Sequence, residues 1–106
     1  MRQCKDIFGR TIRLTEERYK HLVESHPEMN HQLRKIWKTL AQPFRIVRSN
    51  SDMNVLLYYQ HFYKTPVGNK IMCVVVKSLQ NDYFILTAYF TDAIKHGVIL
   101  WNEKRK

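Results

Sequence analysis

The stretch that decides the fold lies in the second half of the chain, at residues 70–90: KIMCVVVKSLQNDYFILTAYF. Two runs rich in β-branched and aromatic residues, 70–79 and 82–90, are separated only by a short polar break that is typical of a turn. Antiparallel strands can follow one another through such a turn, whereas parallel strands need a long crossover. The pattern therefore predicts two neighbouring antiparallel strands.

Two more runs of the same kind come before this pair, FRIVRS (44–49) and NVLLYYQHFYK (54–64). The breaks around the second run, SNSDM and TPVGN, are again of turn type, so the four runs predict an antiparallel meander. After the meander, AIKHG (93–97) is expected to form a helical turn capped at Gly97, and VILW (98–101) a last short strand or a docking segment.

The N-terminal part is predicted to hold a short ribbon and two helices. KDIFGRTIRL (5–14) suggests two short strands that turn at Gly9, and LTEERYKHLVES (14–25) reads as a helix with Thr15 as its N-cap. Pro27 is expected to end this helix and to begin the next one as its first residue. The apolar stripe of the second helix is formed by Met29, Leu33, Ile36, Trp37 and Leu40.

We therefore expect a single α+β domain over residues 1–106, with two N-terminal helices packed on one face of a four- to five-stranded antiparallel sheet. Alternation along the last strand of the meander assigns its residues to two faces. The residues expected beneath the helices are Phe84, Leu86, Ala88 and Phe90. Those expected on the other face are Tyr83, Ile85, Thr87 and Tyr89, a set suited to base stacking or to an ordinary half-exposed sheet face.

Charge points to a polyanionic partner, with a merely soluble basic protein as the alternative. Eighteen Lys and Arg residues stand against nine Asp and Glu, which gives a formal net charge of +9. No apolar run is long enough for a membrane span, and the first residues lack the apolar stretch of a signal peptide. Cys4 and Cys73 are expected to be reduced, so we expect a cytoplasmic protein without a membrane partner.

Two histidines five residues apart mark the segment HLVESHPEM (21–29). On a helix they point about 140° apart, so a shared metal ion is disfavoured, and no metal or cofactor is expected. They remain candidates for core polar groups, helix-end caps or proton-transfer groups. Because His26 falls on the apolar side at the helix end, we interpret it as mainly structural. His21 falls on the polar side, and we interpret it as the proton-transfer residue.

Histidine, cations and hydroxyl groups in a basic protein suit metal-free RNA cleavage. A base removes the proton of the 2′-OH, the 2′-oxygen attacks the adjacent phosphorus, and an acid protonates the departing 5′-oxygen. Imidazole titrates near neutral pH and can serve both transfers. No glycine-rich phosphate loop and no GxSxG motif occurs in the sequence, which contains three glycines.

Five segments also carry a resemblance to a known family: DIFGRTIRLTEERYKHLVESHPEM (6–29), LAQPFRIVRS (40–49), LLYYQHF (56–62), IMCVVVK (71–77) and FILTAYFTDAIKHG (84–97). The most specific parts are the HxxxxHPE element and the TAY strand followed by a short IKxG turn. Through them the chain resembles a phage-associated branch of the barnase–EndoU–colicin–RelE-like (BECR) nuclease superfamily. The resemblance implies N-terminal helices and an antiparallel sheet whose open face cleaves RNA.

Matching positions supply the candidate site. The catalytic candidates implied by the resemblance are His21, His26, Thr87 and Tyr89. The candidates for binding RNA or its phosphates are Arg48 and Tyr58, with Lys77 as a further cation or as part of a solvated rim. Arg48 suits a phosphate clamp, because a guanidinium can bind phosphate oxygens bidentately.

The expected function is that of a small metal-independent endoribonuclease that leaves 2′,3′-cyclic phosphate ends, as a toxin or phage-conflict effector. RNA is the expected substrate, and an inhibitory antitoxin-like protein is the expected protein partner. Two alternatives remain at this point. One is a non-catalytic RNA-binding module that uses the same basic surface. The other is a toxin-like domain that is active only on the ribosome.

Overall fold

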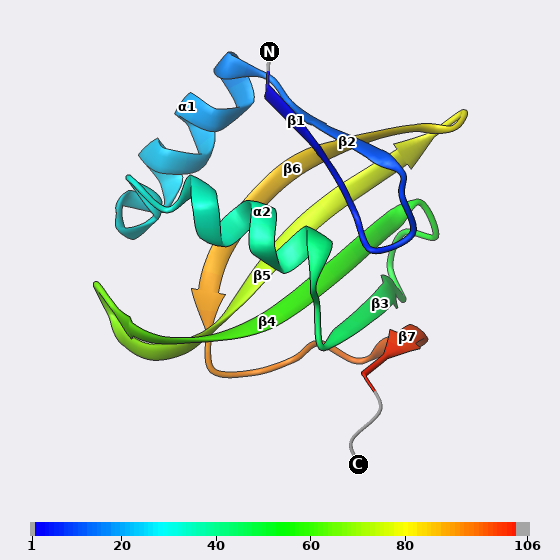
Figure 1. The fold of residues 1–106 in the computed structure, drawn as a ribbon. Coiled ribbons are helices and arrows are strands. Elements are labelled where there is room, and N and C mark those ends of the chain that lie inside the picture. The colour runs from blue at the N-terminus through cyan, green and yellow to red at the C-terminus, as the bar shows by residue number, and fades with distance from the viewer. Residues whose placement is uncertain (1, 104–106) are drawn as a thin grey trace.

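The computed structural model describes residues 2–103. Its elements in chain order are β1 (Arg2–Lys5), β2 (Thr11–Leu14), α1 (Glu16–Ser25), the 3₁₀ helix η1 (Pro27–Met29), α2 (Leu33–Ala41), β3 (Arg45–Ser49), β4 (Val55–Thr65), β5 (Gly68–Leu79), β6 (Asp82–Thr91) and β7 (Gly97–Asn102). Two α-helices and one sheet confirm the predicted α+β class (Figure 1).

The sheet is larger than predicted and is not purely antiparallel. Its seven strands lie in the order β1-β2-β6-β5-β4-β3-β7. The meander β3-β4-β5-β6 is confirmed, because each of these strands pairs antiparallel with the next. The N-terminal hairpin adds two strands, since β2 pairs parallel with β6 through Ile12 opposite Tyr83. The last strand, β7, pairs with β3 at the other edge.

The first helix begins as predicted, but the second begins later. The Thr15 hydroxyl accepts a hydrogen bond of 3.1 Å from the backbone N–H of Arg18, which is the expected N-cap. Pro27 opens a single 3₁₀ turn instead of α2, which starts at Leu33. His31 takes a left-handed backbone conformation (φ 65°) between the two, and this breaks the helical path.

The segment before β7 also differs from the expectation. Residues 93–96 form no helical turn, and Gly97 is the first residue of β7 rather than a helix cap. A side chain at Gly97 would meet the Arg48 carbonyl oxygen, which lies 2.3 Å from an ideal Cβ position. Glycine is therefore needed at this point because β7 approaches β3 closely.

The main buried cluster joins the helices to the sheet. Leu22 of α1 and Ile36 and Leu40 of α2 belong to it together with Met72 and Val74 of β5. Figure 1 shows α2 lying across β4 and β5, while α1 lies near β6. This cluster therefore positions the helices against the sheet. Of the helices in the part of the chain described, neither has the length and apolar character needed to cross a membrane.

A β-bulge in β6 corrects the predicted face assignment. Thr87 lies opposite Val75 and Ile85 opposite Val76, so Leu86 is an extra residue. Ala88 and Phe90 belong to the main cluster as predicted, but so do Ile85 and Tyr83. The prediction that the side of Phe84 and Leu86 packs beneath the helices is therefore wrong, because the bulge inverts the alternation before residue 86. The residues predicted to share the other face were Tyr83, Ile85, Thr87 and Tyr89, and only the last two belong there.

The other face of the sheet carries a smaller buried cluster of Val47, Leu57, Tyr59 and Cys73. Cys73 stands between Met72 and Val74 in β5, both of which face the main cluster, so its side chain points the opposite way. Ile94 and Tyr89 pack against this second cluster. The segment between β6 and β7 thus covers part of this face.

Candidate functional site

The predicted site residues fall into several separate places, and His21 lies in a polar hollow beside α1. Four residues of the first helical turns, Thr15, Glu17, Arg18 and His21, line a hollow of about 410 Å³. The His21 Nε2 atom lies 3.7 Å from Glu17 Oε1, and both side chains are well exposed. We call this surface the α1 hollow.

The α1 hollow continues toward the sheet. Thr15 and Arg18 also line a second hollow of about 200 Å³, whose other walls are Arg13, Phe84 and Ile85. The Arg13 guanidinium is held by Asp82, with Nε 3.0 Å from Oδ1. The α1 hollow and its extension therefore combine two guanidinium groups with one imidazole. Such a surface can bind a phosphate and can move a proton beside it.

His26 lies in different surroundings from His21. It is the C-cap of α1, and its ring centroid lies 5.6 Å from that of Tyr89 in β6. Its Nδ1 atom lies 3.6 Å from Glu28 Oε1. The structure thus brings together two predicted catalytic residues, His26 and Tyr89, at the point where α1 ends beside the sheet.

Tyr89 belongs to a buried polar cluster centred on Cys73. The hydroxyl groups of Tyr89 and Tyr59 both interact with the Cys73 thiol. Burial raises the pKa of Cys73 to about 11 and raises the pKa of Tyr89 as well. The Tyr59 hydroxyl also accepts a hydrogen bond of 3.1 Å from the backbone N–H of Lys95. Tyr89 is therefore a neutral hydroxyl group at physiological pH.

Thr87 and Arg48 lie on opposite faces of the sheet. Thr87 is opposite Val75, on the face of the Cys73 cluster and of Tyr89. Arg48 is opposite Leu56, which belongs to the main cluster. Thr87 and Arg48 are therefore not brought together in one site by the sheet.

Tyr58 lies in the core and not at an open surface. Its side chain is fully buried, and its hydroxyl donates a hydrogen bond of 2.6 Å to Asp6 Oδ2. The hydroxyl also accepts a hydrogen bond of 2.9 Å from Arg10, whose Nε is 2.9 Å from the same carboxylate oxygen. Tyr58 therefore ties the β1–β2 turn to β4 from within the core.

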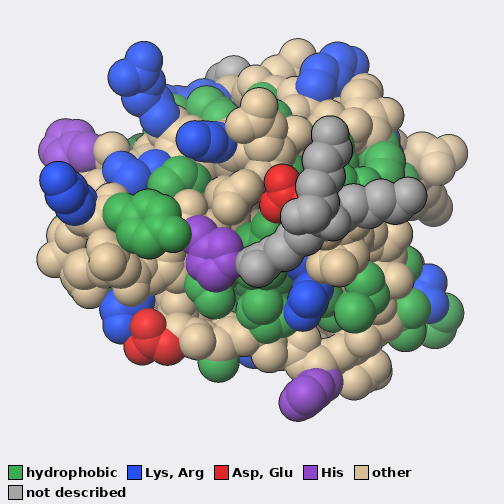
Figure 2. All heavy atoms as spheres, turned by 60° about the horizontal axis from the view of Figure 1, so that its bottom comes forward, with side chains coloured by type: hydrophobic (Ala, Val, Ile, Leu, Met, Phe, Trp, Pro, Cys, Tyr) green, Lys and Arg blue, Asp and Glu red, His purple; other side chains and the backbone are tan. Residues whose placement is uncertain are grey.

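Lys77 is held at the surface by an ion pair, with Nζ 2.5 Å from Asp52 Oδ2. Other cations are likewise engaged, among them Arg2 with Glu16 and Lys70 with Asp92. On the face shown in Figure 2, Lys and Arg side chains are spread around the surface, with hydrophobic side chains between them. Positive charge on this face is therefore dispersed.

Glu17 and Arg18 were not predicted as site residues, although both line the α1 hollow with His21. Both could have been predicted from the sequence, because residues three and four positions apart are neighbours on a helix surface. Arg18 lies three and Glu17 four positions before His21. Within residues 2–103, no three His, Cys, Asp or Glu side chains are grouped closely enough to hold a metal ion.

The comparisons with known proteins gave no match for this chain. No family model matches the chain. No curated protein and no solved structure matches it either.

Proposed function

We propose that this protein binds RNA and cleaves it without a metal ion, with the α1 hollow as the reaction site. One observation carries the proposal: the His21 imidazole and the Arg18 guanidinium line the same hollow, and the Glu17 carboxylate lies against the imidazole. These are a proton acceptor, a phosphate ligand and a group that orients the acceptor.

In the proposed reaction, neutral His21 takes the proton of a 2′-OH group. The 2′-oxygen then attacks the adjacent phosphorus, and the bond to the 5′-oxygen breaks. Arg18 stabilises the charge that builds up on the phosphate oxygens, since a guanidinium forms paired hydrogen bonds with them. The 5′-oxygen takes a proton from solvent, which reaches the open hollow. The products are a 2′,3′-cyclic phosphate and a 5′-hydroxyl end.

Of the other predicted residues, His26 has a supporting role in this proposal. His26 holds the end of α1 against Tyr89, so it positions the helix that carries His21. The proposal treats α1 and α2 as one helical layer on a single face of the sheet, which is supported by the cluster that both helices share. A cytoplasmic toxin or phage-conflict effector, controlled by an inhibitory protein, is the biological setting that we propose.

The test is cleavage of total RNA in the presence of EDTA, followed by analysis of the product ends. We expect wild-type protein to produce 2′,3′-cyclic phosphate ends. His21→Ala should lower the cleavage rate by about 100-fold or more, because a positioned general base contributes that much. Its thermal unfolding should stay close to that of wild type, because the side chain is well exposed.

His96→Ala is the matched control, because His96 is another exposed histidine and lies outside the α1 hollow. It should cleave at the wild-type rate. Equal rates for wild type and His21→Ala would contradict the proposed mechanism.

A second candidate function is RNA binding without cleavage. It is favoured by the separation of the two histidines, because His26 contacts Tyr89 and Glu28 while His21 contacts Glu17. The α1 hollow is thus lined by a single histidine among the residues described. RNA that stays intact but is retained by the protein would favour this candidate.

A further inference from the structure

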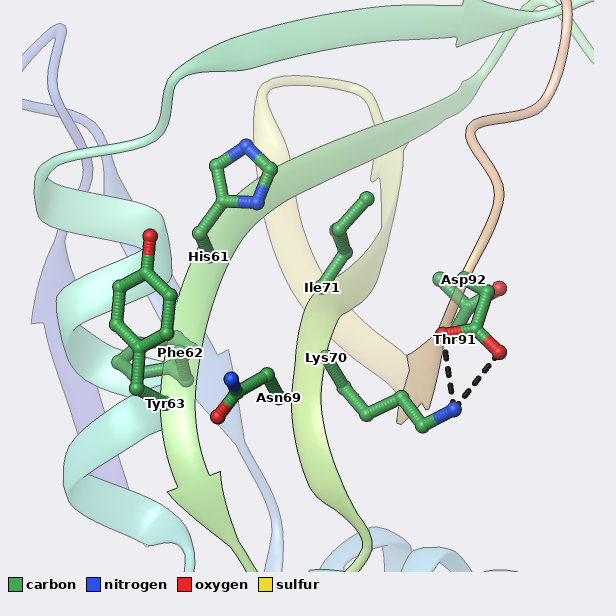
Figure 3. Close-up of a pocket in the computed structure, with 8 residues that line it drawn as sticks. All are labelled: His61, Phe62, Tyr63, Asn69, Lys70, Ile71, Thr91 and Asp92. Carbon is green, nitrogen blue, oxygen red and sulfur yellow. Dashed lines mark hydrogen bonds and ion pairs between the residues drawn. The ribbon is translucent and has the colours of Figure 1, made fainter.

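A second surface feature lies at the far end of the β4–β5 hairpin. A hollow of about 160 Å³ is lined by His61 and Tyr63 of β4, Asn69 and Lys70 of β5, and Asp92 after β6. Figure 3 shows the rings of His61 and Tyr63 rising from the same side of β4. We call this feature the hairpin hollow.

The aromatic rings of the hairpin hollow are available for stacking. Tyr63 is 73% exposed, which is unusual for a large aromatic side chain. The His61 ring stacks on Phe44, with 4.4 Å between centroids and 13° between planes. The Arg45 guanidinium lies 6.0 Å from the centroid of the Phe44 ring. A further flat ring can stack on His61, since the His61 side chain is itself exposed.

Polar groups surround these rings. The backbone N–H of Lys64 donates a 3.0 Å hydrogen bond to Asn69 Oδ1, which fixes the amide and turns its nitrogen, a donor, the other way. Both oxygens of Asp92 accept hydrogen bonds from Lys70, at 2.8 and 2.7 Å, so this pair is internally neutralised. Lys64 has a left-handed backbone (φ 56°) where the pairing of β4 with β5 becomes irregular. Its side chain adds a positive charge to the hairpin.

We propose that the hairpin hollow binds an unpaired base of single-stranded RNA, stacked on Tyr63 and His61. Exposed aromatic rings beside cations are how proteins bind single strands, because every base has a face that can stack. The Asn69 amide meets the edge of the base, and Lys64 attracts the adjoining phosphate. That the ligand is RNA rests on the proposed function. Base binding at the hairpin hollow, however, does not require that the protein cleaves RNA.

The test uses a fluorescently labelled single-stranded oligonucleotide of 2′-O-methyl RNA, which cannot undergo attack by the 2′-oxygen. Binding is followed by fluorescence anisotropy. We expect Tyr63→Ala to raise Kd about five-fold or more, which is the effect of losing one stacked base. His61→Ala should weaken binding in the same way, whereas Tyr63→Phe, which keeps the ring, should bind like wild type. A duplex of the same sequence should bind more weakly than the single strand.

Met53→Ala is the matched control, because Met53 is 74% exposed but precedes the opposite end of β4. It should leave Kd unchanged. Wild-type affinity in both Tyr63→Ala and His61→Ala would overturn the proposal, as would failure of the wild-type protein to bind the oligonucleotide. Binding that depends on Tyr63, in a protein that does not cleave RNA, would support the base site and reject the proposed enzyme.

Discussion

Cys73 shows how burial changes the chemistry of one residue. Its side chain is completely buried in the second cluster, where two tyrosine hydroxyl groups interact with the thiol. Burial raises the pKa of the thiol from 9.0 to about 11, because the thiolate would be removed from water. Cys4, which is partly exposed, has a pKa raised to about 11 for the same main reason. Both thiols are therefore poor nucleophiles in the folded protein.

This shift predicts how stability depends on pH. A thiol that holds its proton more tightly when folded stabilises the folded state below its unfolded pKa of 9.0, and this contribution is lost as pH rises to about 11. We therefore expect the free energy of unfolding, measured by urea denaturation, to fall over this pH range. Cys73→Ala should show a smaller fall than wild type. An equal fall in both proteins would show that Cys73 does not cause it.

Among the elements, β7 depends most visibly on one close backbone approach. It pairs only with β3 within the described sheet, and Gly97 lies close against the Arg48 backbone of that strand. An added Cβ there would lie 2.5 Å from Val47 Cγ1 as well as against the Arg48 carbonyl. Since these are packed or backbone atoms, the strands would have to separate.

Gly97→Ala should therefore weaken the attachment of β7 and lower the free energy of unfolding by about 1–3 kcal/mol, the usual cost of overpacking. Hydrogen exchange should become faster at the β7 amides. Gly9→Ala is the control: its backbone is left-handed (φ 81°), but a Cβ there meets nothing within 4 Å. It should cost stability through local strain and leave exchange in β7 unchanged. Unchanged β7 exchange in Gly97→Ala would contradict the packing argument.

At the scale of the whole molecule, part of the positive charge is paired with carboxylates. The chain carries +9, but many cations are held by carboxylates, such as Arg10 by Asp6 and Lys70 by Asp92. Figure 2 shows the positive side chains spread over the face in view. Part of the positive charge is therefore neutralised within the protein, and the cations on that face are dispersed.

RNA affinity should accordingly fall with salt, but less steeply than the net charge suggests. Each phosphate contact contributes about −0.7 to the slope of log K against log salt concentration for a single strand. Arg18→Ala should reduce the magnitude of that slope by about this amount, because Arg18 lines the α1 hollow. Lys38→Ala, on α2, should leave it unchanged. An affinity that does not vary with salt would reject the electrostatic part of the proposed function.

Local patterns determined most of the secondary structure. The four runs of β-branched and aromatic residues became β3, β4, β5 and β6, and Thr15 caps α1 as its sequence context predicted. His21 was placed on the exposed side of α1 from helical spacing alone. These features follow from the sequence because they depend on neighbours within about one helical turn or one strand.

Only the tertiary structure decided the rest. The bulge at Leu86, the parallel pairing of β2 with β6 and the burial of Tyr58 against Asp6 had no local signal. Asp6 and Tyr58 are 52 residues apart, and their contact arises because a buried carboxylate must find a donor. Strand register and core packing depend on residues far apart in the chain. For that reason the sequence predicted the elements, whereas the faces that they present and the grouping of the site residues appeared only in the folded protein.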